Sequence, residues 1–384
     1  MLAVSLLALL AWLYLLVFRG GFWRADQVLP AAQPPESFPP VAVIIPARDE
    51  AETIAKVVGA HQKSDYPGEL RLFVCDDGSS DGTGELARGT EGPQQVEVLS
   101  VPPLKEGWSG KLHALDHGVK AATEAMPEAG WYLFTDADIK AAPSLLTKLV
   151  AAGERCDLSL VSVMARLDAS GFWGRLLVPA FIYFFQKLYP FPLVNQAGGR
   201  VAAAAGGVVL IRPEALREIG GLAAMRDALI DDCTLAEKVK KAGARIGLYL
   251  SSDFAEAVSL RPNDSYEVME KMVARSAYTQ LRYNPVLLLG TLVGLALLYL
   301  VPPLAFLGLP FHGNGSVALL GLLAWGVMVV TYIPTLKRYG MKRRQALALP
   351  LAALLYGWFT WLSAWRTWQG RGGQWKGRSY ASAE

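Results

Sequence analysis

The sequence has few cysteines and little net charge, and each scarcity argues against a class of protein. Its three cysteines, among 384 residues, are far apart and lack the spacing of a metal site. They therefore indicate a reduced compartment rather than a disulfide framework. The formal net charge of +3 gives no basis for binding nucleic acid. Charged residues make up only 18% of the chain against 52% hydrophobic residues, which is too apolar for a purely soluble protein.

The first apolar run lies at the N-terminus. Leu2 to Phe18 contains no charged residue and is long enough to span a bilayer, and it lacks the basic start and the cleavage site of a secretory signal. Arg19 and Arg24 follow it, which favours a cytoplasmic position for the next segment. We predict a transmembrane anchor over 1–20 and a stiff proline-rich linker over 21–40.

The C-terminal third predicts further membrane helices. The loop between the second and third of its apolar stretches holds five basic residues over 337–344, which places that loop in the cytoplasm. The basic tail, 369–384, also favours the cytoplasm, whereas counting spans would place it outside. We therefore predict a transmembrane region of two to three helices over 284–368 and leave the side of the tail open. The uncharged stretches are 285–309, 316–336 and 346–365.

Strands and helices alternate in the middle of the chain, which predicts an α/β domain with a doubly wound, mostly parallel sheet over 41–283. In such sheets ligands bind outside the carboxyl ends of the strands. Two acidic pairs, Asp76/Asp77 and Asp136/Asp138, fall at that edge. The expected strands are 41–46, 70–77, 96–101 and 131–138, and the expected helices are 50–60 and 111–125.

An aromatic segment at about 171–192 interrupts this alternation. It carries Arg175 and Lys187 and is broken by Pro179 and Pro190. The pattern is typical of a segment that lies in the membrane interface. A pair of buried helices in the soluble core is an equal alternative.

The acidic pairs suggest sugar-nucleotide chemistry. Asp136 and Asp138 are two residues apart at a predicted strand end, so their carboxylates would share one side of the chain and could hold a divalent metal on a diphosphate. Asp76 and Asp77 begin the turn sequence DDGSSDGT and could accept hydrogen bonds from a ribose or a base. An Asx-turn without a ligand is the alternative.

Three further features fit the same chemistry. Asp231 and Asp232 precede a helix, where the helix dipole favours the ionised carboxylate, so one of them could act as a general base; a plain N-cap is the equal alternative. Lys111 opens another helix after a glycine-containing turn and could meet a phosphate. Gly206 and Gly207 would allow the backbone to approach a ligand closely.

Five segments, taken in order, resemble family 2 glycosyltransferases of the GT-A fold. They are VAVIIPARDEAETI, VCDDGSSDGT, GWSGKLHAL, LFTDADI and LIDDCTLAEKV, within about residues 40 to 285. Together with the terminal apolar segments they look most like the hopanoid-biosynthesis-associated branch, and more distantly like ceramide glucosyltransferases. The resemblance implies a membrane-bound inverting enzyme that transfers a sugar from a nucleotide-diphosphate sugar, favouring a UDP-sugar, to a lipid acceptor.

The resemblance also implies roles for individual residues. Asp232 would be the catalytic base, with Asp231 in place of the family's usual Glu. Asp138, with Asp136, would bind Mg²⁺ or Mn²⁺. The nucleotide-sugar site would be formed by residues from several segments: Pro46, Arg48, Glu50, Asp76, Asp77, Lys111, Asp136, Gly206 and Gly207.

One segment departs from the family pattern. Where the family has Gln-x-x-Arg-Trp, this chain reads ARSAYTQLRY at 274–283. Arg275, Gln280 and Arg282 are thus candidates for closing over the diphosphate. Arginines that merely flank a membrane span are the alternative.

The sequence predicts a multi-pass protein of the bacterial cytoplasmic membrane with its catalytic domain in the cytoplasm. The alternatives are a processive polysaccharide synthase and a non-catalytic nucleotide-binding membrane protein. The few spans and the altered Gln-x-x-Arg-Trp segment disfavour the synthase, and the presence of every expected acid disfavours the non-catalytic protein. The sugar, the acceptor lipid, the choice between Mg²⁺ and Mn²⁺ and the oligomeric state are left open.

Overall fold

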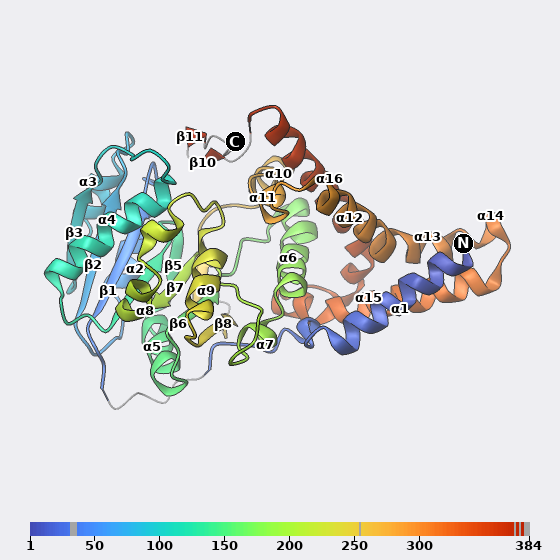
Figure 1. The fold of residues 1–384 in the computed structure, drawn as a ribbon, viewed down its shortest axis with the longest axis horizontal. Helices are drawn as coiled ribbons and strands as arrows, with labels where there is room; N and C mark the ends of the chain where they lie inside the picture. Colours follow the sequence, from blue (N-terminus) through green and yellow to red (C-terminus); the bar gives the residue numbers. More distant parts are fainter. Residues whose placement is uncertain (31–36, 253–254, 372–373, 376–377, 380–384) are drawn as a thin grey trace.

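The computed structural model of the protein describes residues 1–30, 37–252, 255–371, 374–375 and 378–379. The chain forms two parts that lie side by side, one built around a β-sheet and one made of helices (Figure 1). Parts of the expected linker (31–36) and of the expected basic tail lie outside the described residues.

The first part contains a seven-stranded sheet in the order β3-β2-β1-β4-β7-β6-β8. Neighbouring strands are parallel except around β7, which runs antiparallel to β4 and to β6. This confirms the predicted α/β class and the mostly parallel sheet. The strands are β1 (Val41–Ala47), β2 (Leu70–Asp76), β3 (Gln95–Ser100), β4 (Trp131–Thr135), β6 (Leu160–Met164), β7 (Val208–Ile211) and β8 (Ile246–Leu250).

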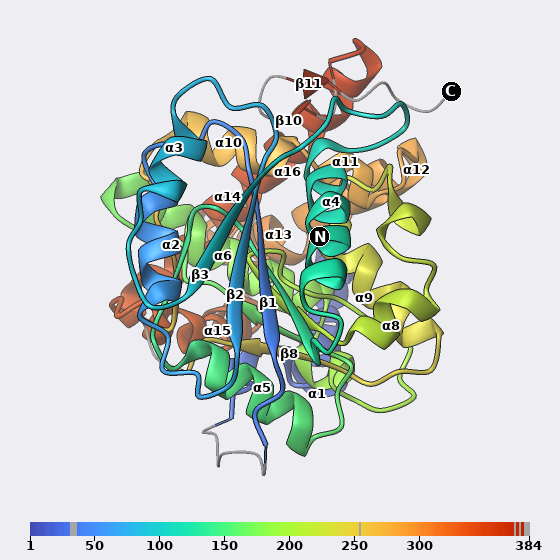
Figure 2. The same ribbon diagram turned by 90° about the vertical axis from the view of Figure 1, so that its left-hand side faces the viewer.

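Helices cover both faces of this sheet (Figure 2). Successive residues of β1 point to opposite faces, so Ile44 joins one hydrophobic core and Val43 and Ile45 join the other. All of β1 is buried, which is why its sequence is continuously apolar. One face is covered by α4 (Gly110–Ala125), α8 (Pro213–Glu218), η2 (Leu222–Met225) and α9 (Asp231–Lys241), the other by α2 (Ile54–Gln62), α3 (Thr83–Arg88) and α5 (Leu145–Arg155).

Element boundaries differ from the sequence expectation at two places that matter for the site. The strand expected to reach Asp138 ends at Thr135, and the chain then turns. A short two-stranded antiparallel sheet follows, formed by β5 (Ile139–Ala141) and β9 (Ala257–Ser259). The helix expected from Glu50 begins only at Ile54, because residues 50–53 form a turn.

The second part is made of apolar helices. Four helical segments of the described chain are long and apolar enough to cross a membrane: Gly171–Val194, Pro285–Leu307, Gly315–Arg338 and Arg343–Trp368. The N-terminal apolar helix is shorter, with 17 residues. The elements are α1 (Leu2–Phe18), η1 (Phe22–Arg24), α6 (Gly171–Leu188), α7 (Phe191–Val194), α10 (Tyr266–Ala274), α11 (Ala277–Gln280), α12 (Pro285–Leu295), η3 (Ala296–Leu300), α13 (Val301–Leu307), α14 (Leu309–His312), α15 (Gly315–Arg338), η4 (Arg343–Ala348) and α16 (Leu349–Trp368). Near the C-terminus, β10 (Gln374–Trp375) pairs with β11 (Arg378–Ser379).

The aromatic helix α6 joins the two parts (Figure 1). Its Tyr183 is fully buried in a hydrophobic core shared with α1, α10, α15 and α16. The Tyr183 hydroxyl lies 2.8 Å from the hydroxyl of Thr331 on α15, and the Tyr356 hydroxyl on α16 donates to the carbonyl of Leu177 at 2.9 Å. Ile182 of the same helix belongs to a hydrophobic core of the sheet domain, so α6 packs against both parts.

Candidate active site

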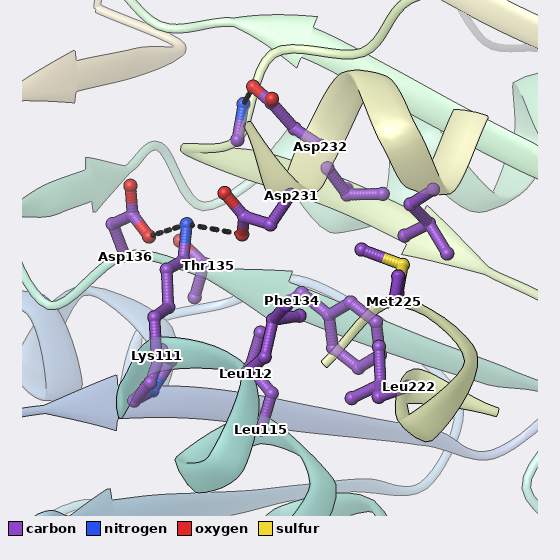
Figure 3. A pocket seen from close by; sticks show the side chains of 14 residues that line it. Lys111, Leu112, Leu115, Phe134, Thr135, Asp136, Leu222, Met225, Asp231 and Asp232 are labelled. Carbon is purple, nitrogen blue, oxygen red and sulfur yellow. Dashed lines mark hydrogen bonds and ion pairs between the residues drawn. The ribbon is translucent and has the colours of Figure 1, made fainter. Parts of the chain in front are cut away.

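The centre of the candidate site is a lysine held between two carboxylates (Figure 3). The ammonium nitrogen of Lys111 lies 2.9 Å from Oδ1 of Asp136 and 3.1 Å from Oδ2 of Asp231. Burial lowers the pKa of Lys111, but the two carboxylates more than offset this, so the net pKa shift is upward. Lys111 is therefore a fixed cation at this position.

Local sequence explains how the lysine reaches this point. Ser109 is the N-cap of α4 and its hydroxyl accepts a hydrogen bond from the Leu112 amide, which fixes the start of the helix. The Ser109 amide in turn donates to the carbonyl of Arg226 at 2.7 Å. Lys111 thus lies in the first turn of a helix whose start is anchored to the segment before α9.

Asp232 lies beside this cluster at the start of α9. Its Oδ2 accepts a hydrogen bond from the Gly206 amide at 2.7 Å, and its Oδ1 accepts one from the Cys233 amide at 2.7 Å. Burial and the neighbouring Asp231 raise the pKa of Asp232 to about 6, although Lys111 and the two amides oppose the shift. A carboxylate with a pKa near the working pH is suited to general base catalysis.

The absence of a side chain at Gly206 allows its backbone to lie close to Asp232. A Cβ atom at this glycine would lie 3.1 Å from Oδ2 of Asp232, so a larger residue would press on the carboxylate. Gly207 instead packs against Ile139 and accepts a hydrogen bond from the Thr135 hydroxyl at 3.0 Å. The two glycines thus lie close to Asp232 and to the end of β4, and their predicted approach to a ligand stays a prediction.

A small pocket opens at the cluster. Pro46 from β1 lines it, together with polar groups on one side and apolar side chains of α4, β4, η2 and α9 on the other (Figure 3). The residues that line it include Lys111, Asp136, Gly206, Asp231, Asp232 and Pro46. The carboxyl edge of the sheet therefore carries a pocket, as the topology predicts.

Asp138 does not join this cluster. Its Oδ2 lies 3.2 Å from Nε of Arg261 and accepts a hydrogen bond from the Ser259 hydroxyl at 2.9 Å. Arg261 also pairs with Glu50. The expectation that Asp136 and Asp138 share one side of a strand is wrong, because β4 ends before both residues and the turn sends the two carboxylates to different cations.

Arg261 is a residue that the sequence reasoning missed. It follows the short strand β9, which pairs with β5, and that pairing brings the arginine to Asp138 across a long sequence separation. An isolated arginine in a loop carries no local sequence signal. Only the topology identifies it.

The nucleotide-binding candidates of the first two strands also gather at the sheet edge. Nη1 of Arg48 donates to the Asp77 carbonyl at 2.5 Å and lies 3.6 Å from Oδ2 of Asp77. Oδ1 of Asp76 accepts a hydrogen bond from the Ser79 amide at 2.9 Å, as in a turn closed by an aspartate, and its contact with a ribose or a base stays a prediction. Asp77 is 2% exposed, which leaves Asp76 as the more accessible of the pair.

The candidates near the C-terminal helices divide into two groups. The Gln280 amide donates to the Tyr189 hydroxyl at 2.7 Å, and Tyr189 in turn contacts Cys233 beside Asp232. Arg275 and Arg282 are exposed and form no ion pair within the described part of the chain. The structure thus links Gln280 to the site through Tyr189 and Cys233, and the role expected of the two arginines stays a prediction.

Carboxylates that could help to hold a divalent cation are present at the sheet edge, but they do not form one ligand set, because Asp136 pairs with Lys111 and Asp138 pairs with Arg261. Within the described residues no group of three or more His, Cys, Asp and Glu side chains could hold a metal by itself. Asp136 and Asp138 nevertheless offer carboxylate oxygens two residues apart. Mg²⁺ in particular commonly takes one or two carboxylates and completes its shell with substrate phosphates and water.

The sequence profile described as "Glycosyl transferase family 21" matches residues 3–383, nearly the whole chain. The chain belongs to glycosyl transferase family 21. It is therefore a glycosyltransferase, which confirms the enzyme class expected from the motifs, while the branch within the superfamily stays a prediction.

Two known proteins illustrate the similarity. Glycosyltransferase AglE of Haloferax volcanii is 33% identical over 92 residues, which are 23% of this chain and 29% of AglE, so the chain spans less than a third of that relative. The mannosyltransferase PcManGT from Pyrobaculum calidifontis, solved in complex with GDP-Man and Mn²⁺, matches with a TM-score of 0.54. That match has 20% identity and covers 92% of this chain and 99% of that chain, and it supports the GT-A fold.

Proposed function

We propose that this glycosyltransferase moves a sugar from a nucleotide-diphosphate sugar to a lipid acceptor at the cytoplasmic face of a bacterial inner membrane. The proposal rests on one observation: the same chain has a polar pocket at the edge of its sheet and a bundle of apolar helices packed beside the sheet domain. A soluble acceptor would not require the catalytic domain to be joined to such helices.

On the donor side, we assign the diphosphate to Lys111 and the nucleoside to the edge formed by Arg48, Asp76 and Asp77. A phosphate entering the pocket would draw the Lys111 ammonium away from its carboxylates, because a diphosphate carries more charge than either of them. Bound Mg²⁺ or Mn²⁺, held by Asp138 and Asp136, would supply positive charge against the departing nucleoside diphosphate. The Mn²⁺ and GDP-Man in the PcManGT complex support this choice of cofactor and donor class. A UDP-sugar remains the donor that we favour.

On the acceptor side, we assign the general base to Asp232. Its pKa near 6 leaves it ionised at neutral pH while keeping it basic enough to accept a proton from an acceptor hydroxyl. Attack from the side opposite the departing diphosphate would invert the anomeric carbon. Asp231 pairs with Lys111 and raises the pKa of Asp232, so we assign it a supporting role rather than that of the base.

Two finer assignments belong to the same proposal. The resemblance to the hopanoid-associated branch suggests a hopanoid or another isoprenoid or sphingolipid-like acceptor. We place the domain boundaries as expected from the sequence, with an anchor over 1–20, a catalytic domain over 41–283 and membrane helices over 284–368. A processive polysaccharide synthase would extend its product repeatedly, whereas this proposal requires a single transfer.

The test is sugar transfer by the full-length protein in detergent. UDP- and GDP-sugars are offered with Mg²⁺ or Mn²⁺, with and without a bacterial membrane lipid extract, and the release of nucleoside diphosphate and the glycolipid product are measured. We expect metal-dependent release that rises with lipid, is lost in Asp138→Ala, and falls by about 10²- to 10⁴-fold in Asp232→Asn. Near-normal turnover of folded Asp232→Asn would show that the base is wrongly assigned. A ladder of products with many sugars would favour the processive synthase.

A further inference from the structure

Two cations that do not line the catalytic pocket lie together where the apolar helices meet the sheet domain. Arg19 directly follows α1, and its guanidinium donates to the backbone carbonyls of Lys187 at 3.2 Å and Leu188 at 2.9 Å. Both Arg19 and Lys187 are partly exposed. The end of α1 is thereby joined to the end of α6.

Among the residues that the structure describes, the partners of the Lys187 ammonium are a hydroxyl and two aromatic rings. It donates to the Tyr299 hydroxyl at 2.8 Å and lies 4.6 Å from the centroid of the Tyr299 ring and 5.3 Å from that of Phe184. Such ring faces stabilise a cation but do not neutralise it.

No carboxylate of the described residues compensates this pair of charges. Arg19 repels Lys187, and neither forms an ion pair with an acid in the part of the chain that the structure describes. Two neighbouring like charges beside an apolar surface are costly unless an anion joins them. An ionisable group within an apolar helix is in general a sign of function.

The surface around the two cations is apolar. Phe18 is 71% exposed, Val17 is 63% exposed and Leu188 is 46% exposed, and these residues adjoin Arg19 and Lys187 in the chain. The chain directly after Arg19 is closely packed, because a Cβ atom at Gly20 would lie 2.8 Å from the side chain of Leu193. A free anion would leave this apolar surface uncovered, whereas a lipid has acyl chains to cover it.

We propose that Arg19 and Lys187 form a binding site for the phosphate of an anionic phospholipid, whose acyl chains lie against Phe18, Val17 and Leu188. This lipid is distinct from the sugar acceptor, and the inference does not depend on the donor or acceptor assigned above. It differs from the general attraction of basic loops to anionic membranes, because it requires two particular side chains.

The site is placed where its occupancy can affect catalysis. Tyr189, two residues beyond Lys187, accepts the hydrogen bond from Gln280 and contacts Cys233, the neighbour of Asp232. A lipid that fixes the end of α6 would therefore also fix the contacts behind the catalytic base.

The test measures lipid binding by the full-length protein in uncharged detergent. Short-chain phosphatidylglycerol, short-chain phosphatidylcholine and inorganic phosphate are titrated separately, and the melting temperature and native mass spectrum are recorded. We expect phosphatidylglycerol to raise the melting temperature and to remain bound in the mass spectrum, and the other two to do neither. An equal response to phosphatidylcholine would overturn the proposal, and an equal response to inorganic phosphate would show a simple anion site instead.

Variants decide whether the two cations are responsible. Lys187→Met keeps the apolar stem and should weaken phosphatidylglycerol binding on the order of tenfold, the loss expected for one charged hydrogen bond. Lys187→Arg should retain the binding. Lys342→Met removes an exposed cation of the 337–344 loop and should leave the binding unchanged. If Lys187→Met does not fold, Arg19→Gln takes its place. The site would be refuted if folded Lys187→Met, or Arg19→Gln in its place, bound phosphatidylglycerol as tightly as the wild type. It would also be refuted if Lys342→Met lost as much affinity as that variant.

Discussion

The acid limb of the pH profile offers a direct test of the charge arrangement around Asp232. Its pKa in the folded protein is about 6, above the usual 3.8, so the proton leaves only as the pH rises through about 6. If Asp232 is the general base, kcat/KM should rise with pH and reach half its maximum near pH 6. Below that point it should fall about tenfold per pH unit, because only the ionised fraction is active.

Two neighbours should move this limb in opposite directions. Lys111 holds the pKa of Asp232 down, so Lys111→Gln should shift the limb to higher pH. Asp231 pushes the pKa up, so Asp231→Asn should shift the limb to lower pH. A nearby charge commonly moves a carboxyl pKa by about 1 to 3 units. With a shift of one unit, Lys111→Gln would leave roughly half of Asp232 ionised at pH 7, compared with about nine-tenths in the wild type.

The assay is nucleoside diphosphate release by detergent-purified enzyme between pH 5 and pH 9, at subsaturating donor and fixed free Mn²⁺. The position of the limb is the readout rather than its height, because Lys111→Gln also removes a phosphate contact and should lower the plateau by about 10²- to 10³-fold. Lys120→Gln is the control, since Lys120 lies on the same helix but pairs with Asp116 at the surface. Shifts of the same sign in the two site variants would refute the electrostatic account, and an unmoved limb would exclude Asp232 as the titrating base.

Two other predictions follow from packing and from ion pairing. A Cβ at Gly118 would lie 2.5 Å from Ile44, so Gly118→Ala should lower the free energy of unfolding by about 1–3 kcal/mol. Gly59→Ala, also within a helix but with its nearest contact at 3.7 Å, should be neutral or stabilise by up to about 1 kcal/mol, and chemical denaturation that ranks the two the other way would contradict this. Arg261→Ala removes the guanidinium that pairs with Asp138 and would compete with Mn²⁺ for its carboxylate. The Mn²⁺ concentration for half-maximal activity should therefore fall by roughly tenfold, the change expected from the loss of one ion pair. An unchanged Mn²⁺ requirement would show that Arg261 and the metal do not compete.

The fold could be predicted largely because its signals are local. Short-range patterns predicted both parts of the molecule. The apolar runs of β1 and β2 and their alternation with helices predicted the sheet domain, and the long uncharged stretches near the C-terminus predicted the helical part. The antiparallel β7 could not be predicted in this way. Its direction depends on pairing with β4 and β6, both distant in sequence, and its short apolar run looks like any other buried strand.

The site was predictable to the extent that its residues follow strands or open helices. Asp136 was expected at the sheet edge, and Lys111, Asp231 and Asp232 were expected at the starts of helices. The structure brings all four together. The partner of Asp138 was not foreseen, because Arg261 reaches it only through the β5–β9 pairing. Spacing rules fail here for a physical reason: they assume that a regular strand continues through both acids.

The pairing of Lys111 also predicts how donor binding changes the base. In the structure its ammonium neutralises Asp136 and Asp231, which lowers the proton affinity of Asp232 nearby. A bound diphosphate would draw the ammonium toward itself and leave more negative charge around Asp232. The base should therefore be stronger in the donor complex than in the free enzyme. Since kcat reports the complex and kcat/KM reports the free enzyme, the acid limb of kcat should lie at higher pH than that of kcat/KM. Coincident limbs in the wild type would show that Lys111 keeps its carboxylate partners when the donor binds.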